Sequence, residues 1–122
     1  LPAEKWTASG AASTSFRLPS PSAIALGFIC WDPRNRPEYV EIGHNGIRTK
    51  YKGKGFGKAQ LSEAVRRIKG YNGLKEIRVL TNGNLVAPKN YESVGFVLYD
   101  RKENNDEAAF SGDYLYYRIQ LQ

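Results

Sequence analysis

The chain has 122 residues, of which 41% are hydrophobic and 25% charged, and a net charge of +6; these values are typical of a single globular domain, here residues 1–122. No apolar run approaches the roughly 20 residues of a membrane span, and the segment LPAEKWTASG lacks the apolar core of a signal peptide, which argues against a membrane protein. A single cysteine, Cys30, excludes an internal disulfide and fits a reducing compartment such as the cytoplasm, and one cysteine with one histidine suggests no metal site.

The first 47 residues are predicted to form a lead-in and three strands. The run TASGAASTS is small and polar, which is typical of a loose segment, and apolar runs follow between turn residues. The predicted segments are the lead-in at 1–13 and strands at 14–18, 23–31 and 37–47. The turn DPRNRP at 32–37 predicts that the last two strands form an antiparallel hairpin, and Asn45-Gly46 predicts a bulge or bend near the end of the hairpin.

The pattern then changes to that of a helix. Apolar residues recur at i, i+3, i+4 and i+7, which predicts an amphipathic helix over 56–69 that stops at Gly70. The residues of this apolar stripe are Leu61, Ala64, Val65 and Ile68. The rest of the chain predicts a strand at 75–82, a short helix ending at Gly95, and strands that begin with FVLYD at 96 and YLYYRIQL at 114.

Between the third strand and the long helix lies YKGKGFGKAQL, residues 51–61, with three glycines at alternate positions. Glycine lets backbone approach a ligand closely, and the N–H groups here would crowd the positive end of a helix. Five cations stand in or beside this stretch: Arg48, Lys50, Lys52, Lys54 and Lys58. The stretch therefore predicts an anion cradle for a phosphate group, with a tight exposed turn as the alternative.

Two common phosphate-binding loops do not fit this stretch. A GxGxxG dinucleotide loop fails because Gln60 stands where the third glycine belongs. A Walker A loop fails because Ala59 replaces the Ser or Thr that would hold magnesium.

The stretch instead resembles motif A of the GNAT superfamily, the acyl-CoA-dependent N-acetyltransferases, which reads Arg/Gln-x-x-Gly-x-Gly/Ala. Here the motif runs Lys52-Gly53-Lys54-Gly55-Phe56-Gly57. Lys52 departs from the family pattern, because it keeps a cation but lacks the planar fork of an arginine.

A second stretch, NLVAPKNYESVGF at 84–96, resembles the later GNAT motif Asn-x-x-Ala-x-x-x-Tyr-x-x-x-Gly-Phe. The residues in register are Asn84, Ala87, Tyr91, Gly95 and Phe96. Pro88 suits the first position of a helix, so the short helix is expected to start there and to leave Asn84 in the preceding loop.

The two motifs lie one helix and one strand apart, as in the family, and cover most of residues 38–97. The resemblance implies an α/β chain of the α+β type, with a mixed, mostly antiparallel central sheet flanked by two helices. In the family, a strand and two helices precede the hairpin, and the helices form one wall of the acceptor site. Residues 1–13 cannot supply them, and the chain starts at Leu1 and has no Met, so we expect a processed or partial GNAT chain without this front end.

The resemblance implies acetyl-CoA as the cosubstrate and no metal. The backbone N–H groups from Gly53 to Lys58 would hold the pyrophosphate, with added charge from Lys52. The residues of this run are Gly53, Lys54, Gly55, Phe56, Gly57 and Lys58. The pantetheine arm would pair like an added strand near Ile47 and Arg48. Asn84 would contribute from the second motif.

Acetyl transfer to an amine needs a base that removes a proton and an acid that protonates the leaving thiolate. Tyr91 occupies the motif position of the family's acid, and Glu41 resembles the general base of the histone acetyltransferases in this superfamily. The backbone N–H of Ile47 would stabilise the oxyanion. A packed aromatic ring is the alternative interpretation of Tyr91, and an exposed strand carboxylate that of Glu41.

These features predict a cytoplasmic N-acetyltransferase that transfers acetyl from acetyl-CoA to a primary amine. The acceptor is a small molecule or a lysine or N-terminus of a protein, and a homodimer is left open. One rival hypothesis is a non-catalytic CoA-binding module or subunit. Another is a basic nucleic-acid-binding domain, which is disfavoured because the aromatic residues do not interleave with the basic loop.

Overall fold

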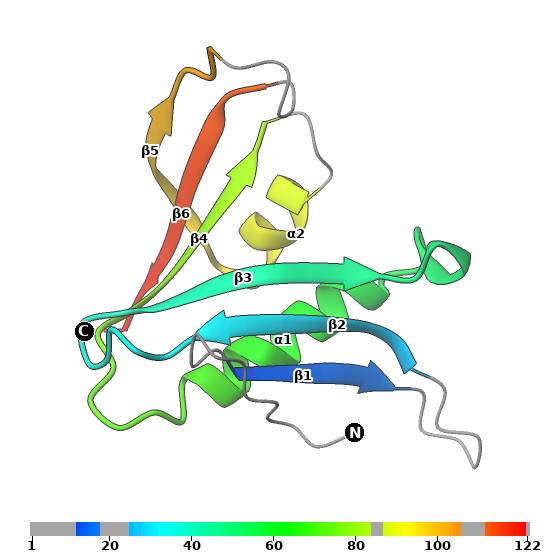
Figure 1. The fold of residues 1–122 in the computed structure, drawn as a ribbon, viewed down its shortest axis with the longest axis horizontal. Helices are drawn as coiled ribbons and strands as arrows, with labels where there is room; N and C mark the ends of the chain where they lie inside the picture. The colour runs from blue at the N-terminus through cyan, green and yellow to red at the C-terminus, as the bar shows by residue number, and fades with distance from the viewer. Residues whose placement is uncertain (1–11, 18–24, 84–86, 106–111, 122) are drawn as a thin grey trace.

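The computed structural model describes residues 12–17, 25–83, 87–105 and 112–121 (Figure 1). Within these ranges, six strands form one sheet in the order β1-β2-β3-β4-β6-β5. The strands are β1 (Ala12–Arg17), β2 (Ala25–Asp32), β3 (Val40–Ile47), β4 (Glu76–Asn82), β5 (Val97–Lys102) and β6 (Tyr114–Gln120). The helices are α1 (Phe56–Ile68) and α2 (Ala87–Val94), and a 3-10 turn, η1, spans Thr49–Tyr51.

The sheet is mixed and mostly antiparallel. Strands β3 and β4 run parallel, whereas β1–β2, β2–β3, β4–β6 and β5–β6 pair antiparallel. Helix α1 packs on β1, β2 and β3, and α2 packs on β4 and on α1. These findings confirm the predicted class of a mostly antiparallel sheet flanked by two helices, including the antiparallel hairpin around residues 32–37.

Some predicted boundaries move by one to three residues. Strand β1 begins at Ala12, inside the predicted lead-in of 1–13, and α2 begins at Ala87, one residue before Pro88. Strand β3 begins at Val40 rather than at 37. The reason lies in the turn, where Pro37 has no N–H for a ladder and the Tyr39 N–H donates to Asn35 O at 3.2 Å.

The hydrophobic core lies between the two helices and the sheet. Alternate residues of each strand point to this side, where they meet the apolar stripe of α1. The buried apolar side chains among the described residues are Ile29, Trp31, Val40, Ile42, Leu61, Ala64, Val65, Ile68, Leu74, Ile77, Val79, Tyr91, Phe96, Leu115 and Tyr117. All four predicted stripe residues of α1 are among them, which confirms that this helix is amphipathic. No helix in the described ranges has both the length and the apolar character to cross a membrane.

The sheet divides where β3 and β4 separate. These strands pair over only three positions, from Val40 opposite Ile77 to Ile42 opposite Val79. Beyond that point the two strands diverge, so the sheet has one half that consists of β1, β2 and β3 and a second half that consists of β4, β6 and β5 (Figure 1). The free edges of β3 and β4 that result from this divergence face one another beside α2.

Strand β3 contains a bulge, but not where the sequence predicted it. Ile29 pairs with Asn45 whereas Trp31 pairs with Ile42, so Gly43 and His44 together oppose Cys30. The expected bulge at Asn45-Gly46 is therefore wrong by two residues. The glycine that permits the bulge is Gly43, where a Cβ would lie 3.2 Å from Cys30 Sγ.

The bulge reverses which residues of β3 face the helices. Before it, the even-numbered Val40 and Ile42 are buried, and Glu41 is exposed. After it, the odd-numbered Asn45 pairs with the buried Ile29 and so shares its face. One extra residue thus places Asn45 on the helix side, which strict alternation would not do.

Candidate active site

The predicted anion cradle connects the end of β3 to the start of α1. In η1, the Tyr51 N–H donates to Arg48 O at 2.8 Å and the Lys52 N–H donates to Thr49 O at 3.2 Å. Gly53 and Gly55 follow with φ of 77° and 84°, the left-handed region that favours glycine. Among the described residues, no atom lies within 4 Å of a Cβ built on either glycine, which leaves space beside this backbone.

The cradle ends at the N-terminus of α1. Gly55 is the N-cap residue, and its carbonyl accepts from the Ala59 N–H at 3.2 Å. Helix geometry leaves the amides of Gly57 and Lys58 without an intrahelical acceptor, and no acidic side chain lies in the first turn. The macrodipole makes this end positive, so the geometry suits an anion.

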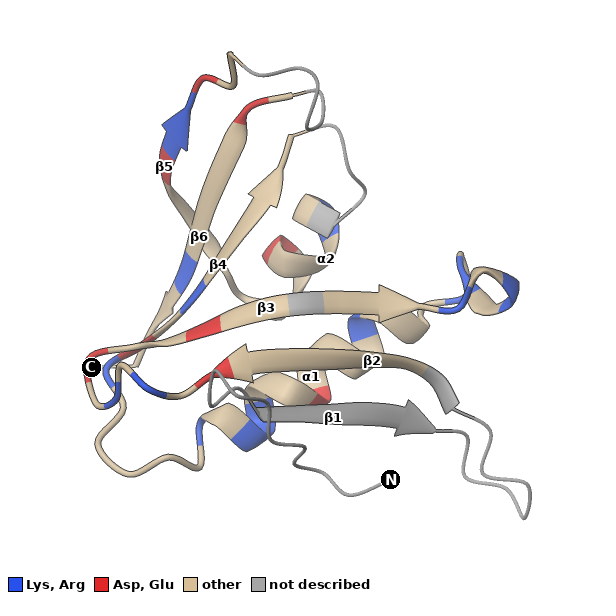
Figure 2. Ribbon diagram, viewed as in Figure 1, with Lys and Arg blue, Asp and Glu red and all other residues tan. Residues whose placement is uncertain are grey.

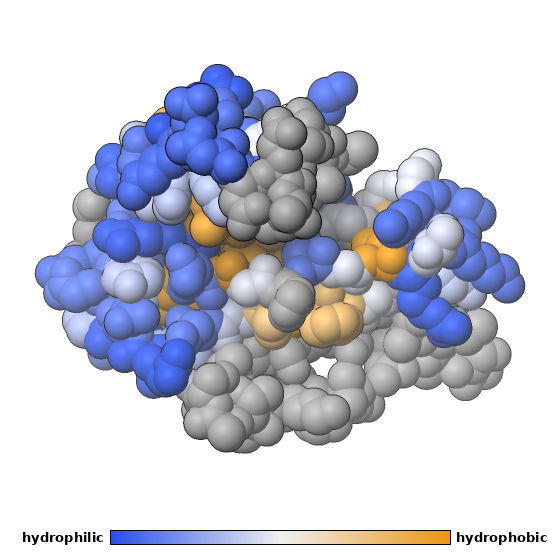
Figure 3. All heavy atoms as spheres, turned by 45° about the horizontal axis from the view of Figure 1, so that its top comes forward, coloured by the Kyte–Doolittle hydropathy of each residue, from blue (hydrophilic) through white to orange (hydrophobic). Residues whose placement is uncertain are grey.

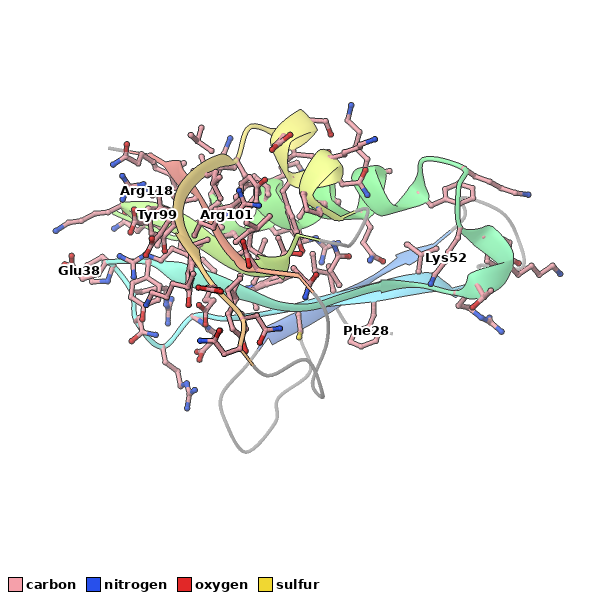
Figure 4. All side chains as sticks on the ribbon, turned by 90° about the horizontal axis from the view of Figure 1, so that it is seen from above. Phe28, Glu38, Lys52, Tyr99, Arg101 and Arg118 are labelled. Atoms are coloured by element: carbon pink, nitrogen blue, oxygen red, sulfur yellow. The ribbon has the colours of Figure 1, made fainter. Side chains whose placement is uncertain are left out.

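The charge around the cradle is of one sign. Residues 48–58 contain no acid, and their basic side chains are exposed. These side chains are Arg48, Lys50, Lys52, Lys54 and Lys58. Figure 2 shows this basic loop projecting beyond the end of β3, and Figure 4 shows Lys52 toward the opposite end of the molecule from Tyr99 and Arg118.

Three elements meet at the base of the cradle. A Cβ on Gly57 would lie 3.3 Å from Asn90 Nδ2 of α2 and 3.7 Å from Ile47 Cγ1 of β3. Ile47 also pairs with Gly27, where a Cβ would lie 2.1 Å from Gly46 O. Glycines therefore allow α1, α2 and the end of β3 to approach closely beside the point where β3 and β4 have diverged.

Tyr91 of α2 is 4% exposed and lies in an aromatic cluster. Its ring centroid is 5.5 Å from that of Phe96 and 6.2 Å from that of Tyr117. Its hydroxyl is hydrogen-bonded to the side chain of Asn45 on β3. Burial raises the pKa of Tyr91 above its ordinary value, and the bond to Asn45 offsets part of that rise.

Asn45 is held from the other side by Gln60 of α1. Gln60 is 1% exposed, and its Nε2 donates to Asn45 Oδ1 at 2.9 Å. The same Nε2 donates to Phe28 O at 3.1 Å and to Gly46 O at 3.2 Å. A row of polar side chains thus runs from α1 through β3 to Tyr91.

The sequence interpretation did not place Asn45 or Gln60 among the predicted site residues. Gln60 did carry a signal, because it directly precedes Leu61 in the stripe of α1 that packs on the sheet. A buried amide is costly unless its hydrogen bonds are satisfied, so a glutamine there indicates a polar partner. No such signal existed for Asn45, because its face depends on the bulge.

Glu41 is exposed on the sheet face opposite the helices. Its neighbours across the strands are Asp32 on β2 and Arg78 on β4. The pairing of β3 with β4 ends one residue later, so Glu41 lies beside the separation but on the opposite face from Tyr91. The structure therefore does not bring these two predicted groups together on one face.

The open face around Glu41 carries a network of aromatic and charged side chains. Arg78 lies 4.0 Å from the ring centroid of Tyr39 and its guanidinium bonds to Glu76 at 2.6 Å. Arg118 lies 4.7 Å from the ring centroid of Tyr99. Figure 3 shows apolar surface at the centre of the molecule, between a hydrophilic side and the basic loop.

In the part of the chain that the structure describes, the hollow beside β5 and β6 and the acidic side chains add no further group to the site. Asn84 lies outside the described residues. An open hollow of about 560 Å³ lies beside β5 and β6 and contains none of the predicted site residues. Across the described residues, no three His, Cys, Asp or Glu side chains gather where they could hold a metal ion.

Comparison with solved structures shows the same fold in several acetyltransferases. The chain is 20% identical to an IAA acetyltransferase from Bacillus cereus, with a TM-score of 0.75. The alignment covers 91% of this chain and 78% of that one. It is 18% identical to an acetyltransferase from Bacillus subtilis solved in complex with CoA, with a TM-score of 0.70 and coverage of 93% and 77%. A spermidine N-acetyltransferase chimera of SpeG from Vibrio cholerae and hSSAT is 18% identical, with a TM-score of 0.73. The alignment covers 90% of this chain and 66% of the chimera.

Sequence comparison gives the family. No curated protein matches the chain. The sequence profile described as "Acetyltransferase (GNAT) family" matches residues 21–96, which is more than half of the 122 residues and includes both motifs, the cradle and Tyr91. With this match and the fold it shares with solved acetyltransferases, the chain belongs to the GNAT acetyltransferase family.

Proposed function

We propose that this protein transfers the acetyl group of acetyl-CoA to a primary amine. The observation that carries the proposal is the cradle, in which two glycines of positive φ lead into the N-terminus of α1 beside the divergence of β3 from β4. A pyrophosphate fits this backbone because the amides, the helix end and the surrounding lysines all favour negative charge. The amides from Gly53 to Lys58 would bind it, and Lys52 would add charge.

The free edge of β3 suits the pantetheine arm. Beyond Ile42, β3 has no strand partner on its β4 side among the described residues, so its backbone groups there can pair with the amides of the arm. Such pairing would put Ile47 and Arg48 beside the arm and would direct the thioester toward Tyr91. The N–H of Ile47 would then stabilise the oxyanion that forms when the amine attacks.

The proton transfers are assigned to Tyr91 and Glu41. The amine must lose a proton, because a lysine-like amine titrates near 10.4, and Glu41 would accept this proton directly or through water. The nitrogen forms a bond to the carbonyl carbon, the C–S bond breaks, and the sulfur leaves with the electron pair. The hydroxyl of Tyr91 would donate its proton to this thiolate, and the second proton that the acetylated nitrogen loses would return through water to the Tyr91 phenolate. Acid and base then act from opposite faces of the sheet, through the gap between β3 and β4.

Binding of the coenzyme is tested first. We expect acetyl-CoA and CoA to bind in calorimetry and to raise the melting temperature, since a ligand at 100 times its Kd adds about 2.7 kcal/mol to the free energy of unfolding. Absence of both heat and thermal shift at millimolar CoA would contradict the proposal. A matched control is ATP, which carries phosphates and adenine but no pantetheine.

Transfer is tested second, with a panel of polyamines, aminoglycosides and lysine peptides and with CoA release as the measurement. We expect at least one amine to accelerate CoA release above the rate of acetyl-CoA hydrolysis. If CoA binds well and no amine is acetylated, the non-catalytic CoA-binding module becomes the better hypothesis.

A further inference from the structure

The row of Gln60, Asn45 and Tyr91 links three elements by polar side chains, of which Gln60 and Tyr91 are buried and Asn45 is half-buried. Gln60 comes from α1, Asn45 from β3 and Tyr91 from α2, and Gln60 and Tyr91 are 1% and 4% exposed. Two buried apolar residues are neighbours of this row: Leu61 follows Gln60 in α1, and the ring of Phe96 contacts that of Tyr91. Burying polar side chains in such a setting costs free energy unless donors are paired with acceptors, so it matters which group of each pair donates.

The direction of the first bond follows from the surroundings of Gln60. Its Nε2 lies within 3.2 Å of three oxygens, which are Phe28 O, Gly46 O and Asn45 Oδ1. Two of these are backbone carbonyls, which only accept, so the end of Gln60 that faces them must be its NH₂ group. That NH₂ group then holds the oxygen of the Asn45 amide toward α1.

The direction of the second bond follows from the first. An asparagine amide carries its oxygen and its NH₂ group on opposite sides, so an oxygen held by Gln60 turns the NH₂ group of Asn45 away from α1. Tyr91, on α2, is the hydrogen-bond partner of that side chain. Asn45 would therefore donate to the phenol oxygen, and the proton of the phenol would stay available for another acceptor.

We propose that Gln60 is a positioning residue, which holds the Asn45 amide so that it donates to the Tyr91 oxygen and leaves the Tyr91 proton for transfer. This rests on the proposed function, in which that proton moves to the sulfur of the leaving CoA. The phenol O–H bond breaks, an S–H bond forms, and the phenolate that remains accepts the N–H of Asn45. If the amide were reversed, the phenol would donate to Asn45 Oδ1 and its proton would be held away from the sulfur.

The kinetic test uses Gln60→Met, which keeps the length of the side chain and removes the donor. With the best amine of the panel, we expect kcat to fall about tenfold or more, because part of a general-acid contribution of about 10²–10⁴-fold is lost. CoA affinity by calorimetry should stay within about twofold of the parent, which also reports that the variant is folded. Asn45→Asp should cause a similar loss, because it presents oxygen to both neighbours.

Non-additivity distinguishes positioning from a structural role. In a Tyr91→Phe background, Gln60→Met should cause no further loss of kcat, because there is no phenol proton left to orient. An equal loss in both backgrounds would overturn the proposal. A fully active Tyr91→Phe would overturn both the proposed role of Gln60 and the assignment of Tyr91 as acid. Intact CoA binding in that variant would still support acetyl-CoA as the cosubstrate.

A spectroscopic test needs no acceptor. Tyrosine labelled with ¹³C at Cζ reports the hydrogen bonding of each phenol, and the Tyr91 resonance is the one that Tyr91→Phe removes. At neutral pH, we expect Gln60→Met and Asn45→Asp to move this resonance toward the shift of a phenolate, since the hydroxyl then donates to an oxygen. An unchanged resonance in both variants would overturn the proposed orientation.

Discussion

Tyr91 and Tyr117 show how two buried phenols in one aromatic cluster can differ. The Tyr117 hydroxyl donates to Glu92 Oε2 at 2.8 Å, and burial together with this carboxylate raises the pKa of Tyr117 to about 12. Burial also raises the pKa of Tyr91, but its hydroxyl meets the neutral amide of Asn45, which offsets part of that rise. A carboxylate retains a phenol proton, whereas an N–H donor stabilises the phenolate, so Tyr91 is the better acid of the two.

Replacing the phenol of Tyr91 tests this difference. Tyr91→Phe keeps the ring and its contacts with Phe96, and we expect kcat to fall by about 10²–10⁴-fold with little change in CoA affinity. Tyr117→Phe is the matched control, because it removes a buried hydroxyl from the same cluster. It should lower the free energy of unfolding and leave kcat within a few-fold. Equal effects of the two variants on kcat would show that Tyr91 contributes to packing and not as an acid.

Glu41 is tested by its charge. Glu41→Gln keeps the shape of the side chain and removes the base, so we expect kcat to fall most near neutral pH and to recover as pH rises toward the pKa of the amine. The control is Glu38→Gln, whose carboxylate is exposed and pairs with Lys75 at 3.1 Å on the surface. A pH–rate profile identical to that of the parent would exclude Glu41 as the base.

The turn between η1 and α1 depends on backbone that only glycine adopts easily. Gly53 and Gly55 both have positive φ, and Gly55 caps the helix without any side-chain hydrogen bond. The cap is thus made of bare backbone, which leaves the end of α1 accessible. A Ser or Asp cap would satisfy an amide internally and would compete with an incoming anion.

Gly55→Ala separates binding from stability. An alanine in the left-handed region costs about 1–2 kcal/mol, and its methyl group would occupy space that the pyrophosphate needs. Gly73→Ala is the matched control, since Gly73 has φ of 72°, nothing lies within 4 Å of its Cβ position, and it lies in the turn before β4. We expect both variants to lose similar stability in urea, and only Gly55→Ala to lose CoA affinity, by about tenfold or more. Equal CoA affinity in the two variants would mean that the loop is only a turn.

The close approach of β2 to β3 at Gly27 is equally testable. A Cβ there would lie 2.1 Å from Gly46 O, which is backbone and cannot rotate away. We expect Gly27→Ala to lower the free energy of unfolding by about 3 kcal/mol in urea denaturation. Gly46→Ala, on the strand that pairs with Gly27, should be neutral or slightly stabilising, because nothing lies within 4 Å of its Cβ position. A neutral Gly27→Ala would mean that the two strands can move apart at no cost.

The charge of the molecule is concentrated rather than spread. The net charge is +6, and five of the 18 Lys and Arg residues fall between positions 48 and 58. Elsewhere many cations are paired, as in the contacts of Arg34 with Asp32, Arg67 with Glu63 and Arg101 with Asp113. This distribution suits one anionic ligand better than the long backbone of a nucleic acid.

A competition experiment tests that interpretation. The few cations of the loop allow about three phosphate contacts, so a single-stranded 20-mer should bind weakly, with a logarithmic salt slope of about −2, and CoA should displace it. Lys52→Ala combined with Lys54→Ala should weaken the binding of both the oligonucleotide and CoA. Tight oligonucleotide binding that CoA does not displace would instead support the nucleic-acid-binding hypothesis.

Local pattern was enough to predict the elements, and the resemblance of two motifs to a known family supplied the class of fold. The i, i+3, i+4, i+7 stripe of α1, the apolar runs of the strands and the turn at 32–37 are short-range signals, and each matches the structure to within a few residues. The alternating glycines of residues 53–57 likewise predicted backbone that a ligand can approach at the start of a helix, and the structure has Gly53 and Gly55 at positive φ directly before α1. The family followed from the same residues.

Pairing between distant strands decided the rest. A bulge forms only when two residues of β3 oppose Cys30 of β2, so no pattern within β3 could place it at Gly43 and His44 rather than two residues later. That single extra residue turns Asn45 toward α1 and α2, where Gln60 and Tyr91 meet it. The register of partner strands sets which face a side chain occupies, and it is a property of the folded sheet rather than of the segment.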